Sequence, residues 1–92
     1  MQKLQPAQVT EATSQLNSWS VENESLVRTF EFTDFAHSMI FVGRVADLAE
    51  SADHHPDIDI RYNKVKLVLS THSAGGLTQK DIDLATQIEH IY

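Results

Sequence analysis

The chain contains no cysteine and no long apolar run. The absence of cysteine excludes a disulfide framework, a thiol nucleophile and a zinc site ligated by cysteine. Nothing in the sequence approaches the ~20 apolar residues of a membrane span, and the N-terminus lacks the apolar segment of a signal peptide. We therefore expect a cytoplasmic protein that makes no membrane contact.

Basic residues are also scarce, because 7 Lys and Arg side chains stand against 13 Asp and Glu side chains and give a formal net charge of -6. This balance opposes the electrostatic binding on which basic nucleic-acid proteins rely, so we do not expect direct binding of nucleic acid. The 92 residues predict a single domain over 1–92. At this size folding buries only about 60% of the unfolded surface, so association of copies would help to stabilise a modest core.

Apolar residues at helical spacing predict a helix at each end of the chain. The first covers about 6–18 and starts at Pro6, because proline suits the first turn of a helix. Its apolar stripe consists of Val9, Ala12, Leu16 and Trp19. The last helix starts at Thr78, which forms a capping-box pattern with Asp81. Its inner face consists of Leu84, Ala85, Ile88 and Ile91.

A longer helix is predicted from Phe35 to about Asp53, after a cap at Thr33 or Asp34. Two apolar stripes run along it. The first comprises Phe35, Met39, Val42, Ala46 and Ala49, and the second comprises Phe41, Val45, Leu48 and Ala52. A helix that is apolar on two sides is expected to be buried on two sides, and in so small a domain the second cover can be another subunit.

Alternation of apolar and polar residues predicts two β-hairpins. The first spans Ser20 to Phe32 with a polar break at 22–25. The second joins a strand over 58–62, through a turn at Asn63-Lys64, to a strand that runs from Val65 up to His72. The element order is therefore α-β-β-α-β-β-α. This order predicts an α+β domain with helices on one face of a four-stranded antiparallel sheet.

Three of the 5 histidines fall close together in the sequence, among several carboxylates. Imidazole has an unperturbed pKa of roughly 6.5, so such a cluster suggests proton transfer or metal binding. Pro56 disfavours helical geometry at His55, so the long helix should end near His54 and release both histidines into a turn. Glu50 lies four residues before His54 and is predicted to orient it, and the helix C-terminus favours a cation there.

Two other interpretations compete with proton-transfer chemistry. In the first, the histidines belong to an ordinary helix end, where the helix dipole alone favours them. His72, predicted on the polar face of its strand, weighs against that interpretation. In the second, the three histidines and a carboxylate bind zinc, although adjacent histidines before a proline form an awkward chelate. Asp81 can likewise be a plain capping-box acid.

From Glu50 onward these residues form one spaced series, Glu50-x3-His54-His55-Pro56-x5-Tyr62-x9-His72-x8-Asp81. The series resembles the signature of the pterin-4a-carbinolamine dehydratase family, and the likeness extends from Trp19 to Ala85. The resemblance implies an enzyme that dehydrates 4a-hydroxytetrahydrobiopterin to quinonoid dihydropterin and water. Such an enzyme recycles the pterin cofactor of aromatic amino acid hydroxylases.

The resemblance also implies that no metal or other cofactor is needed, because pterin is the substrate and the reaction is an acid-base elimination. The catalytic residues that it implies are His54, His55 and His72. The orienting or substrate-binding residues that it implies are Glu50, Pro56, Asp81, Tyr62 and Trp19. Of these, Tyr62 and Trp19 can equally be packing residues. Which histidine acts as acid and which as base stays open.

The family further suggests a homodimer whose edge strands pair, and a dimer of dimers formed through helices. The doubly apolar helix over 35–53 fits such an assembly. Because animal relatives also serve as dimerisation cofactors of a homeodomain transcription factor, a protein-interaction module is a second hypothesis. A third is a same-fold enzyme that acts on another pterin, such as one in molybdopterin metabolism.

Overall fold

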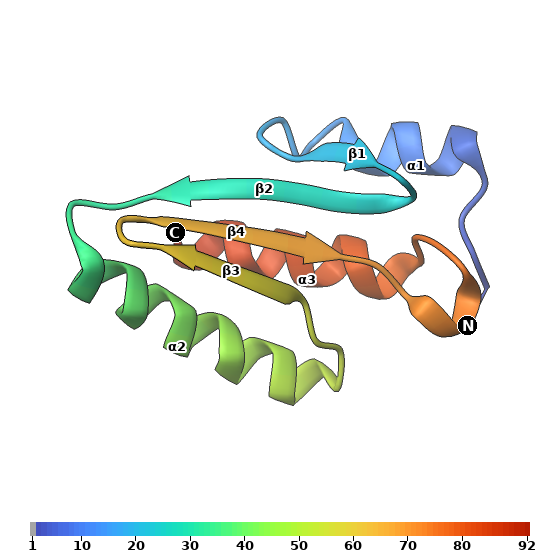
Figure 1. Ribbon diagram of the computed structural model, residues 1–92. Coiled ribbons are helices and arrows are strands. Elements are labelled where there is room, and N and C mark those ends of the chain that lie inside the picture. Colours follow the sequence, from blue (N-terminus) through green and yellow to red (C-terminus); the bar gives the residue numbers. More distant parts are fainter. Residues whose placement is uncertain (1) are drawn as a thin grey trace.

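The computed structural model describes residues 2–92, and Figure 1 shows the order of its helices and strands. The elements are α1 (Pro6–Thr13), β1 (Ser20–Glu22), β2 (Ser25–Glu31), α2 (Phe35–Ala52), β3 (Asp57–Arg61), β4 (Lys64–Leu69), the short 3-10 helix η1 (His72–Ala74) and α3 (Gln79–Ile91). The predicted order α-β-β-α-β-β-α is confirmed. The strands form one antiparallel sheet in the order β1-β2-β4-β3.

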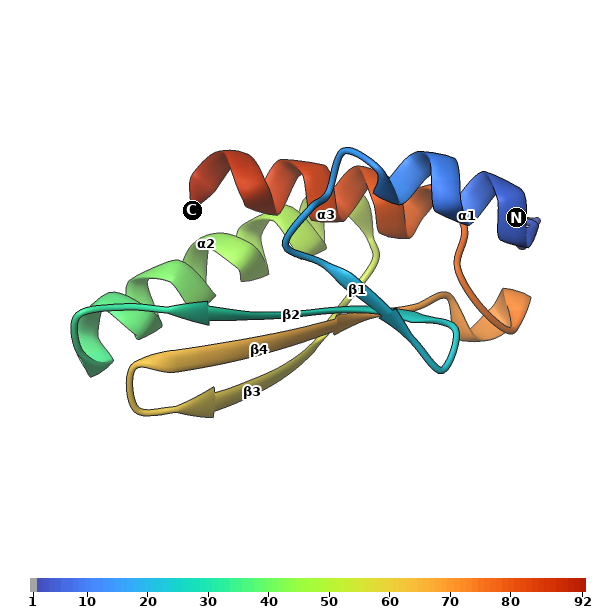
Figure 2. The ribbon, with the colours of Figure 1, turned by 90° about the horizontal axis from the view of Figure 1, so that it is seen from above.

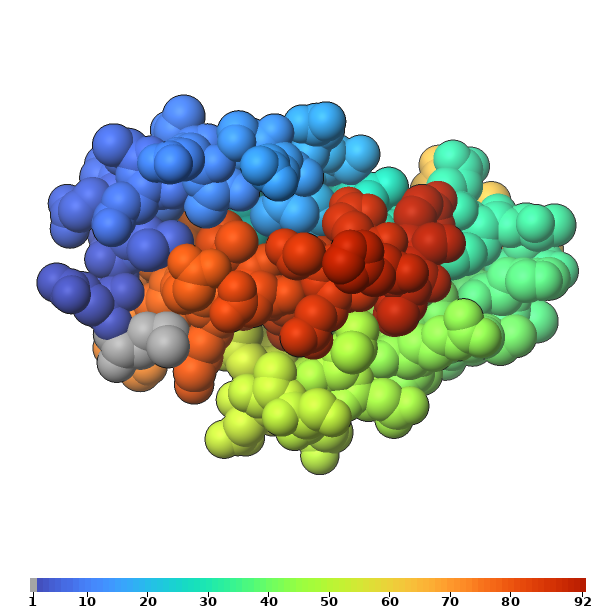
Figure 3. Space-filling view, turned by 180° about the vertical axis from the view of Figure 1, so that it is seen from behind, coloured from blue at the N-terminus to red at the C-terminus, as the bar shows by residue number. Residues whose placement is uncertain are grey.

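All three helices lie on one face of this sheet, as Figure 2 shows, and this confirms the predicted α+β architecture. Figure 3 views the helical side and shows α3 between α1 and α2. The opposite face of the sheet carries polar residues. It is formed by alternate exposed residues of three strands, which are Thr29, Glu31, Asp57, Asp59, Arg61, Lys64 and Lys66. A sheet with one solvated face needs this period-two pattern.

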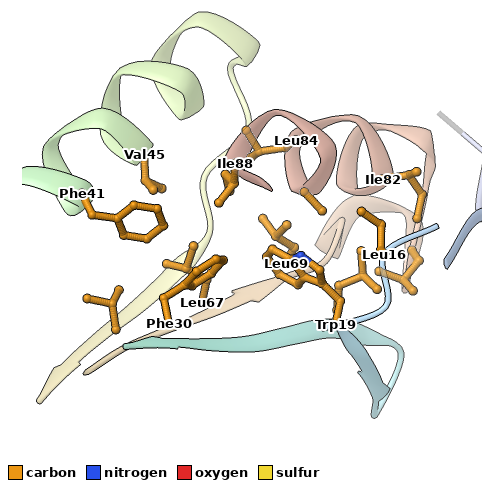
Figure 4. Close-up of a cluster of buried hydrophobic side chains, with 14 residues drawn as sticks. Leu16, Trp19, Phe30, Phe41, Val45, Leu67, Leu69, Ile82, Leu84 and Ile88 are labelled. Carbon is orange, nitrogen blue, oxygen red and sulfur yellow. The ribbon is translucent and has the colours of Figure 1, made fainter. Parts of the chain in front are cut away.

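The hydrophobic core fills the space between the helices and the inner face of β2 and β4 (Figure 4). The register pairs Leu26 with Leu69 and Phe30 with Val65, and side chains of paired residues lie on the same face of a sheet. These four side chains and Leu67 are fully buried. From the helical side the core receives Phe41, Val45, Leu84, Ala85 and Ile88.

The first helix is shorter than predicted, because α1 ends at Thr13 instead of continuing to residue 18. Hydroxyl groups at its end donate hydrogen bonds to helix carbonyls, from Thr13 to Val9 at 2.8 Å and from Ser14 to Glu11 at 2.7 Å. Such bonds compete with helix propagation. Leu16 and Trp19 follow in tight turns that retain three-residue spacing, so both are still buried.

The long helix begins and ends where the sequence predicts. The Asp34 side chain caps α2 by accepting from the His37 backbone N–H at 2.9 Å. This hydrogen bond, followed by that of the His37 side chain, holds the pKa of the Asp34 carboxyl below its usual 3.8. The stability that the cap contributes is therefore present above pH 3.8 and lost as the pH falls through the lowered pKa.

The two apolar stripes of α2 have different surroundings. The second stripe packs into the core through Phe41 and Val45, whereas Phe35 and Met39 of the first stripe are 49% and 40% exposed. The expectation that α2 is buried on two sides is therefore not met within one chain. Cover by another subunit stays a prediction.

The second hairpin departs from expectation at both ends. Its turn is at Tyr62-Asn63, because Arg61 pairs with Lys64, and Asn63 is bound to the end of β2 through two hydrogen bonds with Phe32. At the other end, β4 stops at Leu69 and His72 opens η1, so His72 does not lie on a strand as predicted. The reason is a bridge from Thr71 to Gly76, which folds the chain back.

Within residues 2–92, no helix is both long and apolar enough to cross a membrane. The cytoplasmic location expected from the sequence stays a prediction.

Mutations on the two faces of β4 are expected to change the free energy of unfolding by very different amounts. Leu67→Ala removes a fully buried side chain and is expected to lower the free energy of unfolding by about 2–5 kcal/mol. Lys66→Ala, one residue earlier on the polar face, is expected to stay within about 0.5 kcal/mol of wild type. Urea unfolding at one fixed protein concentration measures both. Equal midpoints for the two variants would contradict the assignment of the core face.

Candidate active site

The histidine pair lies where α2 ends. Asp53 takes the left-handed conformation, with φ 50°, and its backbone N–H donates to Ala49 and Glu50 at the end of the helix. His54 makes one more backbone hydrogen bond, to Ala49 at 3.0 Å. Pro56 then disfavours helical geometry at His55. The chain therefore leaves the helix at this point, as predicted, and presents two adjacent histidines in different directions.

His54 points toward the start of α3. Its Nε2 lies 2.5 Å from Oδ1 of Asp81, and the two side chains are 11% and 0% exposed. The other oxygen of Asp81, Oδ2, accepts the backbone N–H of Thr78 at 2.9 Å and the Thr71 hydroxyl at 2.8 Å. Asp81 is thus both the capping-box acid of α3 and the partner of a histidine. The two interpretations of this residue are compatible.

Glu50 contacts His55 and not His54, which corrects the predicted pairing. Oε2 of Glu50 lies 2.5 Å from Nε2 of His55, with side chains 76% and 56% exposed. The physical reason is the left-handed turn at Asp53, which directs His54 away from its own helix and toward α3. Because the Glu50–His55 pair is exposed, solvent screens it and it stabilises the fold little.

His72 lies just beyond β4, in the segment that meets this corner, but within residues 2–92 no hydrogen bond or ion pair joins its side chain to His54, His55 or Asp81. It follows directly after Thr71, whose hydroxyl binds Asp81, and its side chain is exposed at the start of η1. His54, His72 and Asp81 therefore belong to three segments that meet at one place, namely the end of α2, the end of β4 and the start of α3. Pro56, half-buried, leads from this corner into β3.

Tyr62 lies far from the histidines of its own chain. It occupies the hairpin turn at the other end of β3, six residues from Pro56, which corresponds to roughly 20 Å along a strand. Its side chain is 65% exposed, and its backbone has φ 54°, which is unusual for a bulky residue. A single chain does not bring Tyr62 to the site.

Trp19 is likewise remote from the histidines, because it packs into the core near the C-terminal end of α3. The indole ring is 6% exposed and meets Phe30 edge-on at 5.8 Å. Its Nε1 donates to Glu89 at 2.7 Å, and Glu89 also pairs with Arg28. Since Glu89 is eight residues beyond Asp81, it lies about 12 Å away along the helix.

Thr71 is a site residue that sequence reasoning missed. It is 7% exposed and bonds to both Thr78 and Asp81. The capping-box pattern marked Thr78 and Asp81, but a threonine at the end of a predicted strand carries no comparable signal.

The histidine corner faces solvent through the exposed side chains of Glu50, His55 and His72. Two hollows, of about 460 and 510 Å³, lie elsewhere, one between α1 and β1 and the other between α1 and α3. Neither is lined by His54, His55 or His72. In the part of the chain that the structure describes, no group of three or more histidine, aspartate or glutamate side chains is arranged to hold a metal ion.

Comparisons with known proteins agree on one family. Residues 2–91 match the family model described as "Pterin 4 alpha carbinolamine dehydratase". The chain is 53% identical over 91 residues to a protein of Chloroflexus aurantiacus named "Putative pterin-4-alpha-carbinolamine dehydratase", with 99% of this chain and 98% of the relative covered. A protein of the same name in Acidobacterium capsulatum is 52% identical over 89 residues, with 97% of each covered.

Two solved structures share the fold. A transcriptional coactivator/pterin dehydratase from Brucella melitensis superposes with a TM-score of 0.93 at 35% identity, with 97% of each chain covered. A pterin dehydratase-like protein, identified as a RuBisCO assembly factor in the alpha-carboxysome, gives a TM-score of 0.67 at 20% identity. That alignment covers 79% of this chain and 84% of the other, and it shows likeness of fold alone.

The role of Asp81 in joining three segments predicts a stability effect. Asp81→Asn removes the negative charge and one of the acceptor oxygens, so it is expected to lower the free energy of unfolding by about 1–3 kcal/mol. Asp83→Asn, at an exposed position of the same helix, serves as control and is expected to change it by less than about 0.5 kcal/mol. Urea unfolding compares them. An Asp81→Asn protein as stable as the control would mean that the buried carboxylate does not join these segments.

Proposed function

The chain belongs to the pterin-4a-carbinolamine dehydratase family, and from this premise we propose that it dehydrates 4a-hydroxytetrahydropterins such as 4a-hydroxytetrahydrobiopterin to quinonoid dihydropterin and water. The observation that carries this proposal is the pair of adjacent histidines, each held by its own carboxylate. In a cell that contains an aromatic amino acid hydroxylase, this reaction would return the oxidised pterin to the recycling route.

The reaction is an elimination that needs one proton donor and one proton acceptor. The acid protonates the hydroxyl group on C4a, and the C–O bond breaks as water leaves. The base removes the proton from the neighbouring ring nitrogen, whose N–H electron pair becomes the new C=N bond. No electrons enter or leave the pterin overall, so imidazole side chains supply all the chemistry that the step requires.

The two histidine–carboxylate pairs differ in a way that suits separate roles. His54 is held by a buried carboxylate that fixes the orientation of its ring, as a buried aspartate does in catalytic triads. His55 is exposed and can exchange protons with water. We include His72 as the third catalytic residue, because it follows directly after Thr71, whose hydroxyl binds Asp81, and its side chain is exposed.

Comparison of histidine variants tests this proposal. After treatment with a chelator, wild-type protein is expected to accelerate the dehydration of freshly generated 4a-hydroxytetrahydropterin, and a His54→Ala/His55→Ala double variant is expected to lose about 100-fold or more of that rate. His90→Ala, which changes an exposed histidine at the end of α3, is the matched control and should keep full activity.

A folded wild-type protein that gives no acceleration would contradict the proposal for this substrate. Assaying other 4a-hydroxypterins in parallel would then show whether the same site acts on another pterin. Equal rates for the double variant and wild type would instead show that the activity does not depend on His54 and His55.

We also propose that the protein acts as a homodimer through β3. This strand forms one edge of the sheet, and all five of its residues are exposed, including Ile58 at 38% and Ile60 at 36%. Antiparallel pairing of two β3 strands would place the Tyr62 end of each beside the Pro56 end of the other. Tyr62 would then approach the open histidine corner of the partner subunit, which accounts for its place in the motif.

Charge introduced into β3 tests the dimer. An Ile58→Lys/Ile60→Lys variant is expected to run as a monomer in sedimentation equilibrium, because two lysines on an edge strand oppose pairing with a second copy. Val21→Lys, on the other edge of the sheet, is the control and should leave the mass unchanged. A monomeric wild type, or equal dissociation of both variants, would contradict pairing through β3.

A protein-interaction role is the second candidate function. It is favoured by the exposed apolar residues of α2, since Phe35, Met39 and Ile40 are 49%, 40% and 56% exposed. The description of the Brucella relative as a transcriptional coactivator points the same way. This surface can also join two dimers into a dimer of dimers, and Met39→Lys would weaken either association without reaching the histidine corner.

A further inference from the structure

The Thr71 side chain is hydrogen-bonded to Asp81, the carboxylate partner of His54. Its hydroxyl oxygen is 2.8 Å from the hydroxyl oxygen of Thr78 and 2.8 Å from Oδ2 of Asp81. All three side chains are buried, at 7%, 0% and 0% exposed respectively. Water therefore has little access to these groups, and they must satisfy one another.

Each hydrogen bond between Thr71, Thr78 and Asp81 has a defined donor and acceptor. An ionised carboxylate only accepts, so the Thr71 hydroxyl donates its single proton to Asp81. Because the one proton of the Thr71 hydroxyl is used in that bond, the Thr78 hydroxyl must be the donor in the hydrogen bond between the two threonines. The two hydroxyl groups therefore donate in sequence, Thr78 to Thr71 and Thr71 to Asp81.

These hydrogen bonds determine which ring nitrogen of His54 carries the proton. Oδ2 of Asp81 is occupied by two donors, so the plane of the carboxylate is held with Oδ1 against Nε2 of His54 at 2.5 Å. Because Oδ1 only accepts, Nε2 must carry the proton. In the neutral ring the lone pair is then on Nδ1, which has no protein partner within residues 2–92. The one buried, unpartnered side-chain nitrogen or oxygen in that part of the chain is Nε of Arg28, so Nδ1 of His54 is accessible.

We propose that Thr71 is a positioning residue of this site, and that the Thr78–Thr71–Asp81 chain sets His54 to accept the substrate's proton at Nδ1. The assignment of the substrate proton rests on the proposed function, whereas the tautomer of His54 does not. Without the Thr71 hydroxyl, Oδ2 loses a donor and the carboxylate is free to rotate. Both tautomers of His54 would then be populated.

Histidine ring nitrogen shifts measured by NMR in ¹⁵N-labelled protein test the inference, at a pH well above the ordinary imidazole pKa. Wild type is expected to show His54 protonated at Nε2. Thr71→Val, which keeps the shape and removes the hydroxyl, is expected to shift part of the population to the Nδ1-protonated form. Thr71→Ser restores the hydroxyl and should restore the wild-type shifts. Thr86→Val, which removes a hydroxyl that donates to the Ile82 carbonyl of the same helix, is the control.

Kinetics of the same variants give a second readout. Thr71→Val is expected to lower kcat by about 10–100-fold with little change in KM, because a misplaced catalytic group affects the chemical step. Thr71→Ser should recover most of that loss. If Thr71→Val does not fold, Thr71→Ala, which leaves space in place of the side chain, is measured in the same way.

Two outcomes would overturn the inference. One is a wild-type His54 protonated at Nδ1, and the other is a folded Thr71→Val or Thr71→Ala protein with wild-type ring shifts. The expected shift change in a protein without dehydratase activity would support the positioning role and contradict the proposed function. Dehydratase activity with unchanged ring shifts in the Thr71 variants would support the proposed function and contradict the positioning role. Failure of the inference and failure of the proposed function can therefore be distinguished.

Discussion

The buried carboxylate of Asp81 is the group on which the corner of the fold and its chemistry both depend. A charge removed from water is tolerated only when it is paired and hydrogen-bonded. Asp81 meets that requirement with a backbone N–H, a hydroxyl and an imidazole, each from a different segment. The start of α3, the end of β4 and the end of α2 are therefore joined at one carboxylate. The same contacts that cap a helix also orient His54.

Two adjacent histidines thus acquire different environments from one local event, the left-handed residue Asp53 that ends α2. His54 turns inward to a buried partner, whereas His55 remains in solvent beside Glu50. Neighbouring titratable groups with unlike surroundings are the usual basis for separate acid and base roles. The arrangement is consistent with an elimination reaction, which needs both at once.

The surface of the single chain is polar in some regions and apolar in others. The outer face of the sheet is polar, but the edge strand β3 and the exposed stripe of α2 retain apolar side chains, among them Ile58, Ile60 and Ile40. Exposed apolar residues on an edge strand and on a helix favour association. The open histidine corner at one end of β3 and Tyr62 at the other connect this association to the site, since antiparallel pairing would bring those two ends together.

The sequence by itself determined the element order, the one-sided arrangement of the helices, the end of α2 near His54 and the capping box at Thr78 and Asp81. These features follow from periodicity and from backbone preferences over a few residues, which fold locally. Tertiary structure alone decided the partner of each histidine, the departure of His72 from its strand and the place of Thr71. Local spacing favoured Glu50 as the partner of His54, yet Asp81, distant in the sequence, took that position. The physical reason is that the partner of a buried polar group depends on which remote segments pack beside it, and no local pattern records that.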